Sequence, residues 1–226
     1  MITSVFKEIK GLLLEEDLKV VPVKNYSFLK NAIFINLANN EIEITAMDYP
    51  IMFVKTGGSF LPIALMGFKE KNFFVNTNGS WVKEKYIPSF FRIYPFALVP
   101  AANNNHTIAY DNGYSGINKP KGVEIVKDGA FTEAGQKTVD FMSAQYKSLE
   151  ESKNICKVLE EFGLLKEVEL TSHVEGKEHK TRGLFQVDTE AVNKLDDEKL
   201  LKLVKSSAFR MIDAHLLSLH NLRKLK

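Results

Sequence analysis

The sequence predicts an α+β fold, with a largely antiparallel sheet in the first half and helices gathered C-terminally. Between residues 49 and 100, the 226-residue chain places five of its seven prolines and half of its sixteen phenylalanines. Such a segment favours short elements with large rings packed between them. Short apolar runs in this region are separated by glycine-containing turns. Beyond Thr132, apolar residues recur at helical spacing, which predicts a long helix.

The first fifty residues are expected to form one helix followed by short strands. Apolar residues at the N-terminus follow helical spacing, at Ile2, Val5, Phe6, Ile9, Leu12 and Leu13. The runs Lys19–Val23 and Ala32–Leu37 are typical of strands. Asn39 or Asn40 is expected to cap a helical turn over Glu41–Met47.

Two hairpins are expected next. Ile51–Lys55 and Phe60–Leu65 flank a Gly57-Gly58 doublet, whose residues tolerate the positive φ of a tight turn. Asn72–Asn76 and Ser80–Lys83 flank Asn78-Gly79, a dipeptide typical of a type I′ turn.

The end of the proline-rich segment predicts a short helix and further strands. Tyr86–Tyr94 is expected to be helical, with Pro88 in its first turn and Pro95 ending it. Strands are then expected at Phe96–Val99, Thr107–Tyr110 and Val123–Val126. The last of these is expected to close a hairpin across the loop at Asp111–Gly122.

The C-terminal part is expected to be mostly helical. Thr132 is the expected N-cap of a helix that runs to about Glu161, and Gly163 stops it. Two strands, Leu164–Leu170 and Thr181–Val187, precede helices capped by Asp188 and Asp196. We expect a single domain over residues 1–226. It contains an aromatic β module at about 49–100 and a helical part at about 131–226.

Composition narrows the classes of partner and compartment. A net charge of +2 gives no basic patch of the kind that nucleic-acid binders use, so no nucleic acid is expected. The single cysteine, Cys156, excludes an internal disulfide and is expected in the core. No apolar stretch is long enough for a transmembrane helix, and the N-terminus lacks the features of a secretory signal. A soluble, cytoplasmic protein is therefore expected.

The titratable residues do not form a recognisable catalytic or metal motif. His173, Glu175, Glu178 and His179 are metal-ligating types, but they fall on a charged turn without an HExxH spacing. Asp213 and His220 share one helix face, while His215 points elsewhere and is expected to pack in the core with its ring nitrogens hydrogen-bonded. No catalytic residue, metal or cofactor is predicted.

A partner-binding surface is the better-supported kind of site. Trp81, Tyr86, Arg92 and Tyr94 combine apolar bodies with polar tips, which are enriched in binding hot spots. Arg92 is expected to project outward beside the two tyrosines. The alternative is that these side chains hold a small β-structure together.

Several segments resemble the SapC-like family in the correct order. They are Tyr49–Lys55, Pro62–Gly67, Asn78–Trp81, Tyr86–Pro88, Arg92–Phe96, Gly183–Asp188 and His215–Arg223. The chain is similar to this family over about residues 20–225, although the loop at 111–122 carries no matching motif. The unrelated transporter permease of the same name does not fit, because no membrane-spanning segment is present.

The resemblance implies a bacterial protein associated with surface-layer (S-layer) proteins. No activity, cofactor or catalytic residue set is established for the family. We therefore expect a non-catalytic accessory protein that binds a polypeptide or an enzyme in surface-layer protein production or in peptide or protein modification. The alternative is an enzyme that acts on a peptide or small molecule through residues distant in the sequence. The oligomeric state is not predicted.

Overall fold

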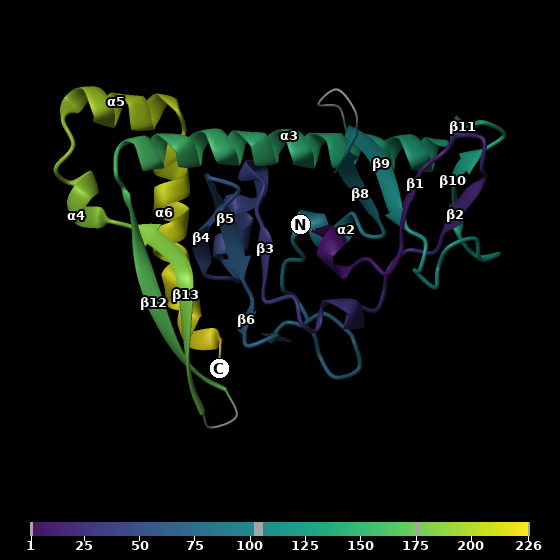
Figure 1. Ribbon diagram of the computed structural model, residues 1–226, viewed down its shortest axis with the longest axis horizontal. Coiled ribbons are helices and arrows are strands. Elements are labelled where there is room, and N and C mark those ends of the chain that lie inside the picture. Colours follow the sequence, from purple (N-terminus) through teal and green to yellow (C-terminus); the bar gives the residue numbers. More distant parts are fainter. Residues whose placement is uncertain (1, 102–105, 175–176, 226) are drawn as a thin grey trace.

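The computed structural model describes residues 2–101, 106–174 and 177–225. The architecture is α+β, as the sequence predicts, with antiparallel sheets built mainly from the first half and the long helices after residue 132. Figure 1 shows one long helix, α3, lying along the molecule, with a larger sheet at one end and smaller sheets at the other. No helix within the described ranges is long and apolar enough to span a bilayer.

The larger sheet has five strands in the order β12-β13-β4-β5-β3, and all neighbours are antiparallel. Its strands are β3 (Phe34–Asn36), β4 (Ile51–Thr56), β5 (Ser59–Leu65), β12 (Leu165–Val174) and β13 (Lys177–Val187). The predicted β4–β5 hairpin is confirmed, with Gly57 and Gly58 at φ of +58° and +80°. The two predicted C-terminal strands are also confirmed. They extend beyond their apolar runs, and Glu169 pairs with Lys180 and Arg182 across them.

Two three-stranded sheets and a ribbon form the other half. The sheet orders are β1-β9-β8 and β11-β10-β2, and β6 pairs with β7. The strands are β1 (Ile9–Gly11), β2 (Leu18–Val20), β6 (Gly67–Phe68), β7 (Lys71–Asn72), β8 (Phe96–Pro100), β9 (His106–Asp111), β10 (Val123–Lys127) and β11 (Ala130–Phe131). The predicted strands at Phe96–Val99 and Thr107–Tyr110 pair with each other as β8 and β9.

Helix α3 (Glu133–Glu161) contacts both halves, through β5 and β10. Thr132 caps it by accepting a bond from the Gly135 amide, and Gly163 follows its end at φ +65°, both as predicted. A Cβ on Gly135 would stand 2.1 Å from the Ile125 carbonyl oxygen. Only glycine therefore permits this close approach of α3 to β10.

Three further helices and a 3-10 segment complete the C-terminal part. They are α4 (Thr189–Val192), α5 (Asp197–Lys205), α6 (Ala208–Ser218) and η5 (Leu219–Lys224). Asp188 and Asp196 cap α4 and α5 by accepting bonds from backbone amides, as predicted. Helix α6 packs against β4, β13 and α1 (Ile42–Ala46).

The predicted helical turn after residue 38 is present as η3 (Asn39–Glu41) followed by α1. Its cap is not the expected asparagine. Ala38 holds the N-cap position, and its amide donates to Oε1 of Glu41 at 3.2 Å. A carboxylate three residues into the turn thus satisfies the terminal amide that an asparagine cap would leave to water.

The predicted N-terminal helix is wrong. A short 3-10 segment, η1 (Ile2–Val5), is followed by β1, which pairs with β9 from Ile9 opposite Asp111 to Gly11 opposite Ala109. The free edge of β9 offers backbone partners that an isolated helix lacks, and Gly11 disfavours a helix. The apolar residues of this segment therefore belong to a 3-10 segment and a strand rather than to one helix.

Three other expectations need correction. The Asn78-Gly79 turn is not type I′: the Gly79 amide bonds to the Asn76 carbonyl, and only Gly79 has positive φ, at +83°. Its flanks meet through one bridge, Val75 with Trp81, rather than a ladder. A type I turn followed by a glycine at positive φ is a common three-residue hairpin connection.

The helix predicted at Tyr86–Tyr94 is shorter, and the last strand pairs differently. Helix α2 covers Ser89–Arg92 only, because the backbone before it is extended and anchored by side chains from other segments. The strand at Val123–Val126 exists as β10, but it pairs with β2 and β11 instead of closing a hairpin across the preceding loop. That loop runs beside β2, where the Val21 amide donates to Gly116.

Candidate functional site

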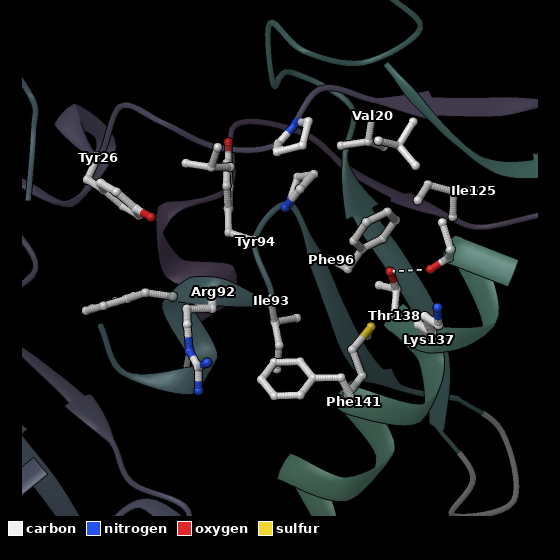
Figure 2. A pocket seen from close by; sticks show the side chains of 17 residues that line it. Val20, Tyr26, Arg92, Ile93, Tyr94, Phe96, Ile125, Lys137, Thr138 and Phe141 are labelled. Atoms are coloured by element: carbon white, nitrogen blue, oxygen red, sulfur yellow. Dashed lines mark hydrogen bonds between the residues drawn. The ribbon is translucent and has the colours of Figure 1, made fainter. Parts of the chain in front are cut away.

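A cavity of about 420 Å³ opens where the aromatic segment meets the start of α3. Residues of α2, β2, β8, β10 and the first turns of α3 line it (Figure 2). Five lining side chains have polar tips, namely Tyr26, Arg92, Tyr94, Lys137 and Thr138, and the rest of the wall is apolar. No acidic residue lines the cavity in the described part of the chain. The cavity therefore suits a mainly apolar group.

Arg92 lies at the edge of this cavity and is exposed, as predicted. Its Nη2 donates to the Tyr86 hydroxyl at 3.0 Å. The guanidinium carbon stands 5.3 Å from the centre of the Tyr86 ring and 5.2 Å from that of Phe141 on α3. The two ring contacts hold the cation in place while part of it faces solvent.

Tyr86 is in turn fixed by a buried carboxylate. Its hydroxyl donates to Oε2 of Glu41 at 2.9 Å, and burial raises the pKa of this hydroxyl. Glu41 also accepts from the Ser89 amide at 2.8 Å and from Ser89 Oγ at 2.7 Å. Arg92, Tyr86 and Glu41 therefore form one chain of hydrogen bonds from the surface into the core.

Tyr94 is buried, and its hydroxyl is used within the fold. It donates to Oδ2 of Asp111 at 2.7 Å, and burial raises the pKa of the hydroxyl. Asp111 is fully buried, and its Oδ1 accepts from the amides of Lys7, Glu8 and Gly113. This carboxylate joins the N-terminal segment to the end of β9. Tyr94 presents only part of its ring to the cavity.

Trp81 is buried at 8% exposure and lies outside the cavity wall. Its indole nitrogen donates to the Tyr49 hydroxyl and to the Tyr86 carbonyl, both at 3.2 Å. Its ring makes edge contacts with Tyr26 and Phe91, two residues that do line the cavity. Of the four candidate binding residues, Tyr86 and Arg92 thus reach the surface, whereas Trp81 and Tyr94 support the wall from inside.

The polar side chains of the cavity are arranged for recognition rather than for proton transfer. Thr138 donates to the Ala134 carbonyl at 2.9 Å (Figure 2), and Lys137 pairs with Glu133 at 2.6 Å on the exposed side of α3. A nucleophile next to a general base is not found among these groups in the described residues. Among the polar groups of the wall, Arg92 has the most hydrogen-bond donors available to a ligand.

His215 is a structural residue, as predicted. Its Nδ1 lies 2.7 Å from the Ile51 carbonyl on β4, and its Nε2 accepts from the Val187 amide on β13 at 3.1 Å. This arrangement requires the neutral ring, and burial lowers the pKa of His215 to about 4. Cys156 is buried in α3 beside Met211, as expected for a core residue, and burial raises the pKa of its thiol.

The remaining histidines lie on the surface or outside the described side chains. Nε2 of His179 is 3.3 Å from Nζ of Lys69, while Glu175 and the side chain of His173 lie outside the described residues. His220 and Asp213 are exposed. Among the described residues, no three metal-ligating side chains converge.

Sequence reasoning missed the partners that complete the site. Phe141 was not identified, although Ala134, Thr138 and Phe141 follow helical spacing beside the stripe that was found. Tyr26 and Glu41 come from segments distant from Arg92, and nothing local to them indicates a shared site. Their contribution depends on how η3, α3 and the segment between β2 and β3 meet.

A comparison with protein families identifies the chain. The family model described as SapC matches residues 15–225, which is nearly the whole sequence. No curated protein and no solved structure matches the chain. The match includes both the segment that carries Arg92 and the helix that carries Phe141. The chain therefore belongs to the SapC family.

Proposed function

We propose that this protein is a non-catalytic accessory protein that binds a polypeptide, in bacterial surface-layer protein production or in peptide or protein modification. The observation that carries the proposal is the apolar cavity of about 420 Å³ with the exposed Arg92 at its edge. An apolar side chain of the partner enters the cavity, and Arg92 contacts the partner's backbone or a carboxylate. The association with surface-layer proteins comes from the family alone.

The arrangement of polar groups supports binding over catalysis. Tyr94 and Thr138 already donate their hydroxyl protons within the protein, and Lys137 is paired with Glu133. A binding site needs a rigid apolar wall and a few oriented polar groups, and this cavity has both. The hydrogen bonds from Arg92 through Tyr86 to Glu41 supply the rigidity.

Site-directed photocrosslinking tests the proposal. A photoreactive phenylalanine derivative at position 141, in the cavity wall, should give an adduct with a defined polypeptide in the native host. The same photoreactive derivative in place of Leu217 serves as the control. Leu217 is 71% exposed on α6 and does not line the cavity. The identified polypeptide, once purified, should bind the wild-type protein more tightly than Arg92→Ala.

The stability of the variant must be checked in the same experiment. Arg92 is exposed and pairs with no acid within the described residues, so Arg92→Ala should lower the free energy of unfolding by only about 1 kcal/mol, through loss of the Tyr86 hydrogen bond and the ring contacts. Equal affinity of the wild-type protein and a stable Arg92→Ala variant for that polypeptide would contradict the proposed site. Adducts at both positions alike would contradict it as well.

A further inference from the structure

The guanidinium of Arg92 has hydrogen-bonding capacity that the protein leaves unused. A guanidinium carries five N–H donors, and one bond, to the Tyr86 hydroxyl, is present within the described residues. Arg182 and Arg210, by contrast, contact Glu169 and Glu43 at 2.6 and 2.8 Å. No carboxylate of the described chain lies within ion-pair distance of Arg92. The unused donors and the charge are available to a ligand.

The position of Arg92 is fixed before any ligand arrives. The Tyr86 hydroxyl accepts a hydrogen bond from Arg92 and donates one to Glu41. Glu41 accepts its other hydrogen bonds from Ser89 and Ala38. The rings of Tyr86 and Phe141 both lie within 5.3 Å of the guanidinium carbon. A side chain held in this way loses little conformational freedom when it binds an anion, which favours affinity.

The surroundings of the cavity favour a negative charge. No acidic residue of the described chain lines it, and Arg92 is the cation of the wall that has no carboxylate partner among the described residues.

The apolar wall and the cation are adjacent, which limits the shape of the ligand. Phe141 lines the cavity, and its ring centre is 5.2 Å from the Arg92 guanidinium carbon. A ligand that fills the cavity and reaches Arg92 therefore needs a carboxylate close to its apolar part. The C-terminal residue of a polypeptide meets this requirement, because its α-carboxylate and its side chain are attached to the same carbon.

We propose that the cavity binds the C-terminal residue of a polypeptide, with an apolar side chain inside and the α-carboxylate on Arg92. The inference rests on the proposed function and adds to it the part of the polypeptide that is recognised. An internal segment would place a neutral amide opposite Arg92, whereas a free C-terminus places a carboxylate there.

Titration with two short peptides tests the inference. N-acetyl-leucyl-phenylalanine with a free carboxylate is compared with its C-terminal amide by nuclear magnetic resonance of the full-length protein at pH 7. The acid should bind at least about tenfold more tightly than the amide, which is the difference expected for one charge-assisted hydrogen-bonded contact. Arg92→Gln should remove this difference. Arg210→Gln, at an exposed arginine outside the cavity, should preserve it.

The outcomes separate this inference from the proposed function. Equal affinity of acid and amide would overturn carboxylate recognition and would leave binding of an apolar polypeptide segment intact. A preference for the acid that survives in Arg92→Gln would overturn the role of Arg92. If decanoate binds in the same cavity about tenfold more tightly than the peptide acid, the ligand is a free amphipathic acid and not a polypeptide terminus. Failure of both peptides to bind would overturn the inference, while the crosslinking experiment tests the function on its own.

Discussion

Two tyrosines of the aromatic segment each donate a hydrogen bond to a buried carboxylate, and each carboxylate accepts three further hydrogen bonds. Tyr86 donates to Glu41, and Tyr94 donates to Asp111. Because the carboxylates are 3% and 0% exposed, their donors must come from the protein. At the scale of single residues, the segment thus contributes hydroxyl groups to stability and leaves Arg92 for recognition.

Tyr94→Phe should destabilise the protein by about 2 kcal/mol, because Oδ2 of the fully buried Asp111 loses its side-chain donor. Tyr86→Phe should cost less, about 1 kcal/mol, because Oε2 of Glu41 keeps the bond from the Ser89 amide. Urea unfolding of both variants measures the difference. A Tyr94→Phe variant as stable as the wild type would show that Asp111 does not depend on this bond.

His215 should make the stability depend on pH. Its pKa is lowered to about 4 in the folded protein, whereas an unfolded histidine titrates near 6.5. The stabilisation is therefore fully present above about pH 6.5. It is lost as pH falls toward 4, because the unfolded chain binds the proton first, and the loss amounts to about 3 kcal/mol.

Comparison with variants isolates this effect from the titration of carboxylates. His215→Gln should show a flatter dependence of the unfolding free energy on pH between 6.5 and 4 than the wild type. His220→Gln, which changes an exposed histidine, should retain the wild-type slope. A wild-type slope in His215→Gln would mean that the buried ring does not titrate in this range.

At the scale of elements, two glycine turns with similar backbone angles differ in their surroundings. Gly58 has φ of +80° and open space around a hypothetical Cβ, whereas Gly79 has φ of +83° and a Cβ there would stand 2.3 Å from Ser27 Oγ. Asn25 is as close, at 2.4 Å. The second turn is therefore packed against the segment that contains η2 (Ser27–Leu29).

Gly79→Ala should destabilise the protein more than Gly58→Ala. Gly58→Ala serves as the control and adds backbone strain of about 1 kcal/mol. Gly79→Ala adds the same strain and also displaces Ser27 or Asn25. Thermal unfolding of the two variants gives the difference directly. Equal losses would show that the contact with Ser27 yields without cost.

The elements that sequence predicted correctly are those specified by local signals. Helix α3 has its capping threonine, its apolar stripe and its terminal glycine within its own segment, and the β4–β5 hairpin has its glycine doublet. The N-terminal segment failed because its structure is set by β9, about a hundred residues away. The candidate site was predicted only in part for the same reason: Tyr86 and Glu41 are 45 residues apart.

At the scale of the whole molecule, α3 packs against the larger sheet through β5 and against the smaller sheets through β10 and β8. The cavity lies where its first turns meet the aromatic segment. Because one helix contacts both halves, we predict that residues 1–226 form a single domain that unfolds as one unit.

Two probes in different parts of the chain test this expectation. The only tryptophan, Trp81, is buried in the aromatic segment and reports on that half by fluorescence. Far-ultraviolet circular dichroism reports mainly on α3 and the C-terminal helices. Their urea midpoints should coincide. Separate midpoints would show that the aromatic module unfolds independently of the helical part.

The hydrogen bond between His215 and Ile51 joins residues that are 164 positions apart. During synthesis, β4 and β5 leave the ribosome long before β13 and α6, so the hairpin initially has one open edge and an unpartnered Ile51 carbonyl. The nascent chain must keep this edge from pairing with other chains until its late partners arrive. The order in which the ribosome releases these segments thus makes the larger sheet the last of the sheets to be completed.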